Sequence, residues 1–195
     1  MKKAVQLLII GTFCAGMIVV SCGKDKPLSS QANESTITTE GSIFELDTLN
    51  SRIEWKGFKV LKTENTSHFG TIKFESGDVT VKDGKLESGK FVADMSTLTS
   101  VDLKDDAENL NKFNGHLKSG DFFETDKFPT ASYEITKVTP NSQGDYNALL
   151  DGNLTIKGIT KSISFDIVVK GKTATTTLKV DRTKYDIKYG SGSFF

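Results

Sequence analysis

Residues 71–95 read TIKFESGDVTVKDGKLESGKFVADM, and this stretch decides the class of fold. Apolar and polar residues alternate on both sides of Asp83-Gly84, which is a strong sequence motif for a two-residue hairpin turn. Alternation of this kind predicts a strand with one buried face and one polar face. The alternating apolar residues are Ile72, Phe74, Val79, Val81, Phe91, Ala93 and Met95. The stretch therefore predicts an antiparallel hairpin with one apolar face.

The same pattern recurs along the chain. Further strands are expected at 44–47, 52–60, 131–135, 146–156 and 163–169, with a last one carrying Leu178 and Val180. The apolar phase shifts at Gly57, which predicts a bulge or bend in that strand. No helical periodicity separates the strands, so the pattern argues against βαβ units.

One segment has helical spacing instead. Residues 105–118 place Leu110, Phe113 and Leu117 three or four positions apart, with acidic residues at the start and Lys118 at the end. About eight strands and one helix on about 150 residues predict an all-β fold, an antiparallel up-and-down barrel. A barrel of eight strands has room inside for one small ligand.

The first 22 residues predict export. Lys2 and Lys3 precede a mostly apolar run at 4–20, which is short for a membrane span. The run ends in VVSC at 19–22, which resembles a bacterial lipobox, so we expect cleavage before Cys22 and lipidation of its thiol. The alternative is an ordinary signal peptide that contains a cysteine. The expected divisions are a signal peptide at 1–21, the lipidated cysteine with a flexible polar linker at 22–43, and a barrel domain at 44–195.

Composition argues against several other classes of function. The chain has 25 basic and 25 acidic residues, whereas nucleic-acid binding needs a basic excess to neutralise phosphates. It has two cysteines, both in the first 22 residues, and two histidines. Few ligands are therefore left for zinc, iron–sulfur or Cys/His chemistry. We expect no cofactor, no bound metal and no nucleic-acid partner.

Some local patterns have a chemical interpretation, but each also has a simpler structural one. Residues 84–90 match the spacing of a phosphate-binding loop, yet Phe91 stands at the Ser/Thr position and the context is a hairpin. His68 and His116 would help to bind a metal if the fold joined them to a carboxylate. A loop end for His68 and packing at the helix end for His116 are the simpler interpretations.

Acidic residues gather before and after the expected helix. A solvated turn and helix start explain them without any site. They are Asp94, Asp102, Asp105, Asp106 and Asp121. No catalytic constellation emerges from the sequence, so we expect a protein that is not an enzyme.

Several separated stretches occur in one order along the chain. They are HLKSGDFF at 116–123, KFPTASYEIT at 127–136, GNLTIKGIT at 152–160 and DRTKYDI at 181–187. Trp55 and HFG at 68–70 fall at matching positions. Together they resemble the YceI family of exported lipid-binding proteins, and the resemblance extends from Phe44 to Phe195.

The resemblance implies a lipocalin-like barrel whose long apolar cavity holds a polyisoprenoid chain. The candidate lining residues lie on the alternating strands and are Trp55, Phe74, Phe91, Met95, Tyr133, Ile135, Phe165 and Ile167. For each of them, plain core packing is the alternative. Phe113 and Leu117 of the helix, with Phe122 and Phe123, are expected to cap one mouth of the barrel.

The expected function is therefore that of an exported, membrane-tethered protein of the cell envelope, on the periplasmic or surface side. Its partners would be an isoprenoid or other long-chain lipid and, through the anchor, a membrane. Two other functions remain open at this point. One is a tethered structural or interaction module without a ligand, and the other is a hydrolase acting on a lipid or small amphiphile, with His68 or His116 as base.

The resemblance also implies one more apolar strand after the residues that end this sequence. That strand would pair with the first one and close the barrel, so we expect a barrel that lacks its last strand. Unpaired strand edges favour exchange of strands between copies and lower stability.

Replacement of the lipobox cysteine tests the tether. We predict that Cys22→Ala releases the protein from membranes, because a polar linker and a nearly neutral domain leave nothing else to hold it there. Fractionation of cells after a salt wash measures this. A variant that still sediments with membranes would contradict the lipoprotein interpretation.

Overall fold

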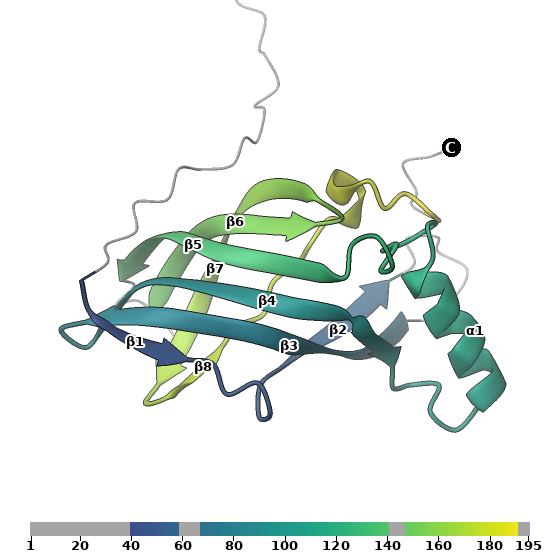
Figure 1. Ribbon diagram of the computed structural model, residues 1–195, viewed down its shortest axis with the longest axis horizontal. Coiled ribbons are helices and arrows are strands. Elements are labelled where there is room, and N and C mark those ends of the chain that lie inside the picture. The colour runs from purple at the N-terminus through teal and green to yellow at the C-terminus, as the bar shows by residue number, and fades with distance from the viewer. Residues whose placement is uncertain (1–39, 59–66, 141–146, 191–195) are drawn as a thin grey trace, which may run out of the picture.

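The computed structural model describes residues 40–58, 67–140 and 147–190 (Figure 1). The expected signal peptide, Cys22 and most of the linker lie outside these residues. The described elements are β1 (Ser42–Glu45), β2 (Arg52–Phe58), β3 (Ser67–Lys82), β4 (Lys85–Ser100), α1 (Ala107–Lys118), β5 (Thr130–Pro140), β6 (Ala148–Ile156), β7 (Ile159–Lys170), β8 (Thr173–Thr175) and the 3-10 helix η1 (Arg182–Tyr185). The expectation of an all-β fold with about eight strands and one α-helix is confirmed.

The long hairpin of β3 and β4 is the centre of the sheet. Its turn is the predicted one, because Lys82 pairs with Lys85 around Asp83 and Gly84, whose φ angles are 51° and 75°. Two positive φ angles at the centre of a two-residue loop match the right-handed twist of the flanking strands. The alternating residues before the turn form one continuous strand, β3, whose pairing with β4 shifts register at three places.

The sheet is antiparallel throughout and runs in the order β1-β3-β4-β5-β6-β7-β8, with β2 also paired to β3. β1 and β2 follow each other along the same edge of β3, against residues 78–81 and 67–73. The sheet curls into a half-barrel (Figure 1). In the described part of the chain, no recorded pairing joins β7 or β8 to β1 or β2.

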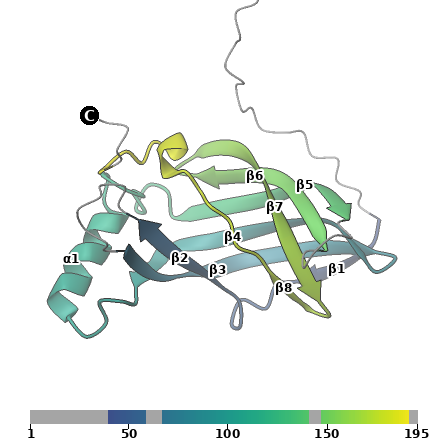
Figure 2. The same ribbon diagram turned by 180° about the vertical axis from the view of Figure 1, so that it is seen from behind.

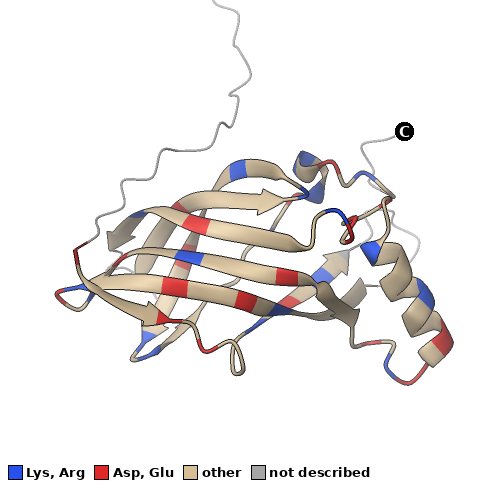
Figure 3. Cartoon of the chain, in the orientation of Figure 1, with Lys and Arg blue, Asp and Glu red and all other residues tan. Residues whose placement is uncertain are grey.

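Charged residues recur along β3, β4 and β5 (Figure 3), and those that pair across the strands share the face opposite the apolar one. Residues of opposite charge face each other across neighbouring strands: Lys73 pairs with Asp94, and Lys90 lies between Asp78 and Glu134. Cross-strand pairs of opposite charge stabilise a sheet. Their side chains occupy the solvated face, and the apolar residues occupy the other face. The alternating residues therefore lie on opposite faces of the sheet, one polar and one apolar, as predicted.

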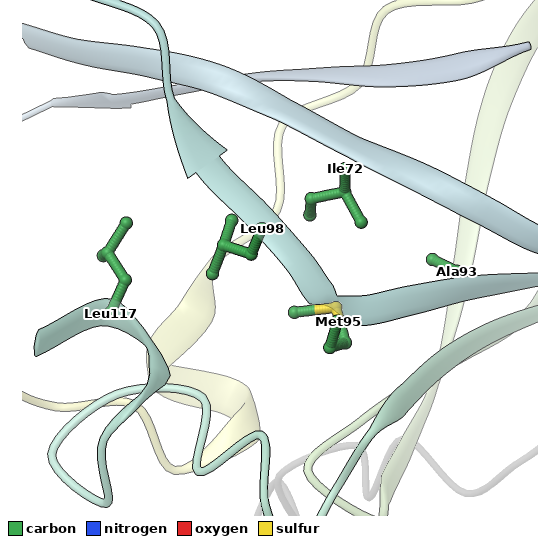
Figure 4. Close-up of a cluster of buried hydrophobic side chains, with 5 residues drawn as sticks. All are labelled: Ile72, Ala93, Met95, Leu98 and Leu117. Atoms are coloured by element: carbon green, nitrogen blue, oxygen red, sulfur yellow. The ribbon is translucent and has the colours of Figure 1, made fainter. Parts of the chain in front are cut away.

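Helix α1 closes one end of the half-barrel (Figure 1). It starts where the acidic residues predicted, since the Asp106 carboxylate caps the helix by accepting from the Asn109 amide at 3.1 Å. Leu117 is buried in a cluster with Ile72, Met95 and Leu98 (Figure 4). No helix among the described residues is long and apolar enough to cross a membrane.

The segment after the helix completes this cap. Phe122 and Phe123 pack with Phe113 against the cluster that contains Leu117, as the sequence predicted. The chain folds back because the Phe123 amide donates to the Leu117 carbonyl at 3.0 Å. Three aromatic rings and Leu117 thus cover the same end of the sheet.

Two local predictions are wrong. β2 pairs with β3 without a shift through Gly57, so the predicted bulge is absent there and the irregular pairings lie between β3 and β4 instead. Leu178 and Val180 do not form a strand; they lie in an extended segment after β8 and are 39% and 42% exposed. Alternating residues form a strand only where a neighbouring strand supplies hydrogen-bond partners. Within the described ranges, no strand pairs with this segment.

Two glycines offer a matched test of the packing. A Cβ on Gly152 of β6 would lie 2.4 Å from the Tyr133 hydroxyl oxygen, whereas a Cβ on Gly115 of α1 would meet no atom within 4 Å. We predict that Gly152→Ala lowers the free energy of unfolding by about 1–3 kcal/mol through overpacking. Gly115→Ala should raise it by up to about 1 kcal/mol through helix propensity. Urea denaturation measures both, and a neutral Gly152→Ala would contradict the close contact with Tyr133.

Candidate functional site

The strand register places the eight predicted lining residues on one face of the sheet. Directly paired residues share a face, as do residues two apart in one strand. Phe91 pairs with Tyr133, and Phe165 and Ile167 pair with the buried Leu150 and Ala148. Trp55 and Met95 pack with the cluster beside α1, while Phe91, Tyr133, Ile135, Phe165 and Ile167 belong to a second cluster between β4 and β7. The Phe74 ring lies 6.3 Å from the Phe91 ring and joins that second cluster.

Contact across an intervening strand shows that this face is the concave one. The rings of Tyr133 on β5 and Phe165 on β7 lie 5.0 Å apart, although β6 runs between their strands. Strands two positions apart are separated by roughly 9.6 Å, so their side chains meet only where the sheet curves toward them. Gly152 of β6 lies beneath the Tyr133 ring and provides the space.

Burial divides the eight residues by type. The aliphatic side chains of Met95, Ile135 and Ile167 are at most 9% exposed, so they are core. The other five are aromatic, and all five are only partly buried. They are Trp55, Phe74, Phe91, Tyr133 and Phe165. These partly buried rings, referred to below as the aromatic row, extend from the α1 end of the concave face to β7.

A groove lies along the edge of β7, beside the last ring of the aromatic row. It has a volume of about 300 Å³ and lies between residues 163–166 and residues 177–179. The Thr176 hydroxyl donates to the Asp166 carbonyl at 2.6 Å, which fixes the extended segment beside β7. Figure 2 shows this segment crossing the open side of the half-barrel. Phe165 lines this groove and also belongs to the aromatic row.

The concave face also holds polar atoms without partners. Among the described residues, four buried side-chain polar atoms lack a hydrogen bond, and Trp55 Nε1 and the Tyr133 hydroxyl are two of them. Burial and the nearby charge of Asp151 raise the pKa of Tyr133, so its hydroxyl stays protonated. A buried polar group without a partner is costly, which makes each of these atoms a candidate contact for a bound molecule.

The two histidines lie in different surroundings. His68, near the start of β3, points its Nδ1 at the Asp102 carboxylate at 2.7 Å, and its ring lies 4.3 Å from the Phe113 ring. His116 packs against Phe122 and Tyr189, as expected for a histidine at the helix end. No group of three His, Cys, Asp or Glu side chains within the described ranges is arranged to hold a metal ion.

Asp102 is the site residue that sequence reasoning missed, because it was interpreted as part of a solvated turn. Its second oxygen accepts from the Ser100 hydroxyl at 2.6 Å and from the Phe69 amide at 3.0 Å. Burial alone raises the pKa of this carboxyl, but the bonds from Ser100, Phe69 and His68 together lower it from 3.8 to about 2. Asp102 is therefore ionised at neutral pH and holds the His68 ring in place.

Comparison with known proteins identifies the family. The YceI-like domain matches residues 44–194. The chain belongs to the YceI-like family. It is 36% identical over 100 residues to a UPF0312 protein of Staphylococcus aureus, a match covering 50% of this chain and 51% of that protein. A UPF0312 protein of Pseudomonas putida is 26% identical over 176 residues, covering 88% of this chain and 75% of the relative.

A solved structure supports the YceI-like fold. The crystal structure of Burkholderia cenocepacia BcnA matches with a TM-score of 0.54 and 17% sequence identity, covering 72% of this chain and 83% of BcnA. At this level of identity the likeness concerns the fold alone. The match to the Staphylococcus aureus relative spans about half the length of that protein. The lipocalin-like barrel class predicted from the sequence is thus confirmed, with this chain forming the curled half-barrel described above.

Neutralising Asp102 tests the polar end of the site. We predict that Asp102→Asn lowers the free energy of unfolding at pH 7 by about 2 kcal/mol, because the carboxylate is bound more tightly to its partners in the folded state. A carboxyl whose pKa is lowered by folding stabilises the protein above its unfolded pKa and loses this effect as pH falls through the folded one. The difference between the two proteins should therefore shrink between pH 4 and pH 2 in denaturant titrations.

Asp105→Asn, which changes an exposed carboxylate nearby, is the control and should leave stability within about 0.5 kcal/mol of the parent protein. A gap between Asp102→Asn and the parent protein that did not change with pH would contradict the assignment.

Proposed function

We propose that this YceI-like protein is a carrier for a long apolar chain, a polyisoprenoid or a similar lipid, which lies along the concave face. The observation that carries the proposal is the aromatic row: five rings on one curved face, each only partly buried. A folded core buries such rings, and a row of them left partly exposed in a concavity matches an apolar ligand that completes the burial.

The energetics favour a ligand of this kind. Each methylene moved from water onto the apolar face contributes roughly 0.8 kcal/mol, so a chain of several isoprene units binds tightly without polar contacts. A lipid that contacts Trp55 at one end and Phe165 at the other would use both apolar clusters. The groove beside β7 gives such a chain a continuation or an exit at the open side of the half-barrel.

We further propose that the protein works in the cell envelope, on the periplasmic or surface side, tethered by lipid on Cys22. A carrier held at a membrane by a flexible linker can take up a water-insoluble ligand there. The half-barrel would then shield the apolar chain from water.

The arrangement around Asp102 supports binding rather than hydrolysis. A serine nucleophile needs its hydroxyl within reach of the histidine that removes its proton. Here the Ser100 hydroxyl donates to Asp102, and His68 contacts the other oxygen of that carboxylate. We therefore favour a non-enzymatic carrier over a hydrolase that uses His68 as base.

Native mass spectrometry tests the proposal. Protein purified from its own host without detergent should carry a bound mass of several hundred daltons, and organic extraction should remove it. Phe165→Asp should abolish this bound mass, because an unpaired carboxylate on the concave face repels an apolar chain.

The matched control is Lys90→Phe, which changes an exposed residue beside Phe91 on the opposite face, away from the groove, and should retain the ligand. Thermal unfolding of both variants separates loss of ligand from loss of fold. A clean ligand-free mass for the parent protein would contradict the carrier function.

A further inference from the structure

A polar cluster lies at the α1 end of the aromatic row. Trp55 pairs with Gly70 and Gly57 with His68, so Trp55 and His68 are diagonal neighbours on the concave face. The Phe113 ring of α1 covers both, with its centre 6.5 Å from the Trp55 ring and 4.3 Å from the His68 ring. The apolar face therefore ends in an indole and an imidazole at diagonal positions, both in contact with Phe113.

The histidine of this cluster offers an acceptor. Asp102 is ionised and accepts at 2.7 Å from Nδ1, so the ring proton of the neutral imidazole lies on Nδ1. The other nitrogen, Nε2, then carries a lone pair. Among the described residues His68 has no hydrogen-bond partner besides Asp102. The side chain is 31% exposed, so a ligand can reach it.

The tryptophan offers a donor. Indole nitrogen only donates, and the buried Trp55 Nε1 finds no acceptor within the described part of the chain. Gly70 brings the nitrogen-bearing edge of the indole onto the backbone of β3, because a Cβ there would lie 2.7 Å from Trp55 Cζ2. Gly70 also pairs with Ser100, the residue that donates to Asp102. The indole thus packs on the same segment of β3 that carries the fixed histidine.

We propose that this cluster binds the terminal hydroxyl of a long-chain alcohol. A hydroxyl donates one hydrogen bond and accepts others, so it can donate to His68 Nε2 and accept from Trp55 Nε1. A carboxylate or an ether has only hydrogen-bond acceptors, so neither can donate a hydrogen bond to the lone pair of Nε2. This inference rests on the proposed carrier function and adds the chemical class of the ligand and its direction, with the hydroxyl at α1 and the chain running toward Phe165.

Three ligands with the same apolar chain test the inference: geranylgeraniol, its methyl ether and geranylgeranoic acid. Trp55 is the single tryptophan of the chain, so its fluorescence reports directly on the site. Titrations at pH 8 should give a Kd for the alcohol about 3- to 10-fold lower than for the ether or the acid, the range expected for one net hydrogen bond.

Variants separate a hydrogen-bonding role of His68 from a structural one. His68→Phe keeps a ring against Phe113 but removes Nε2, so the alcohol should bind no better than the ether, while the Kd of the ether stays unchanged. In Asp102→Asn the amide can donate to Nδ1, which moves the ring proton to Nε2 and should also remove the preference for the alcohol. His116→Phe, which changes the other histidine, should preserve the preference.

The outcomes distinguish this inference from the function on which it rests. Equal affinity of the parent protein for alcohol and ether, or tightest binding of the acid, would overturn the hydroxyl site while leaving the carrier function intact. Failure of all three ligands to bind would overturn both. If His68→Phe did not fold, the comparison of ligands on the parent protein and the Asp102→Asn variant would still decide.

Discussion

The curvature of a single antiparallel sheet is the constraint on which the rest of the structure depends. Strand alternation alone would give a flat sheet with one apolar face exposed to water. Curvature turns that face inward and brings Tyr133 on β5 against Phe165 on β7 over the glycine of β6. Aromatic side chains, the largest apolar ones, cover much of this concave face.

The main features of this architecture were predictable from local sequence. The Asp83-Gly84 turn needs two left-handed residues, and few residue pairs supply them, so the hairpin was predicted correctly. The helix followed from spacing and from an acidic cap. The prediction of a strand at Leu178 and Val180 was wrong because alternation indicates only that a segment is suited to a strand. Whether a partner lies beside it depends on the path of the whole chain.

The candidate site was predictable in its apolar part and not in its polar part. Residues two apart in a strand lie on the same face of the sheet, so the residues that line the concave face could be predicted from alternation. The contact of His68 with Asp102 joins residues 34 positions apart. It forms because the long β3–β4 hairpin brings its two ends together, as Gly70 and Ser100 pair. Neither residue type nor spacing predicts such a contact. An aspartate shortly before a helix is as typical of a solvated turn.

Apolar and polar parts together give the concave face a direction, from the Trp55 and His68 side chains near α1 to a groove beside β7. The central claim is that an apolar chain lies along this face. A polyisoprenoid alcohol with a photoreactive diazirine at its apolar end, irradiated on the full-length protein and mapped by peptide mass spectrometry, tests it most directly. The account predicts cross-links to concave residues such as Tyr133 and Phe165. Cross-links to convex residues such as Lys90 and Glu134, or an even spread over both faces, would contradict it.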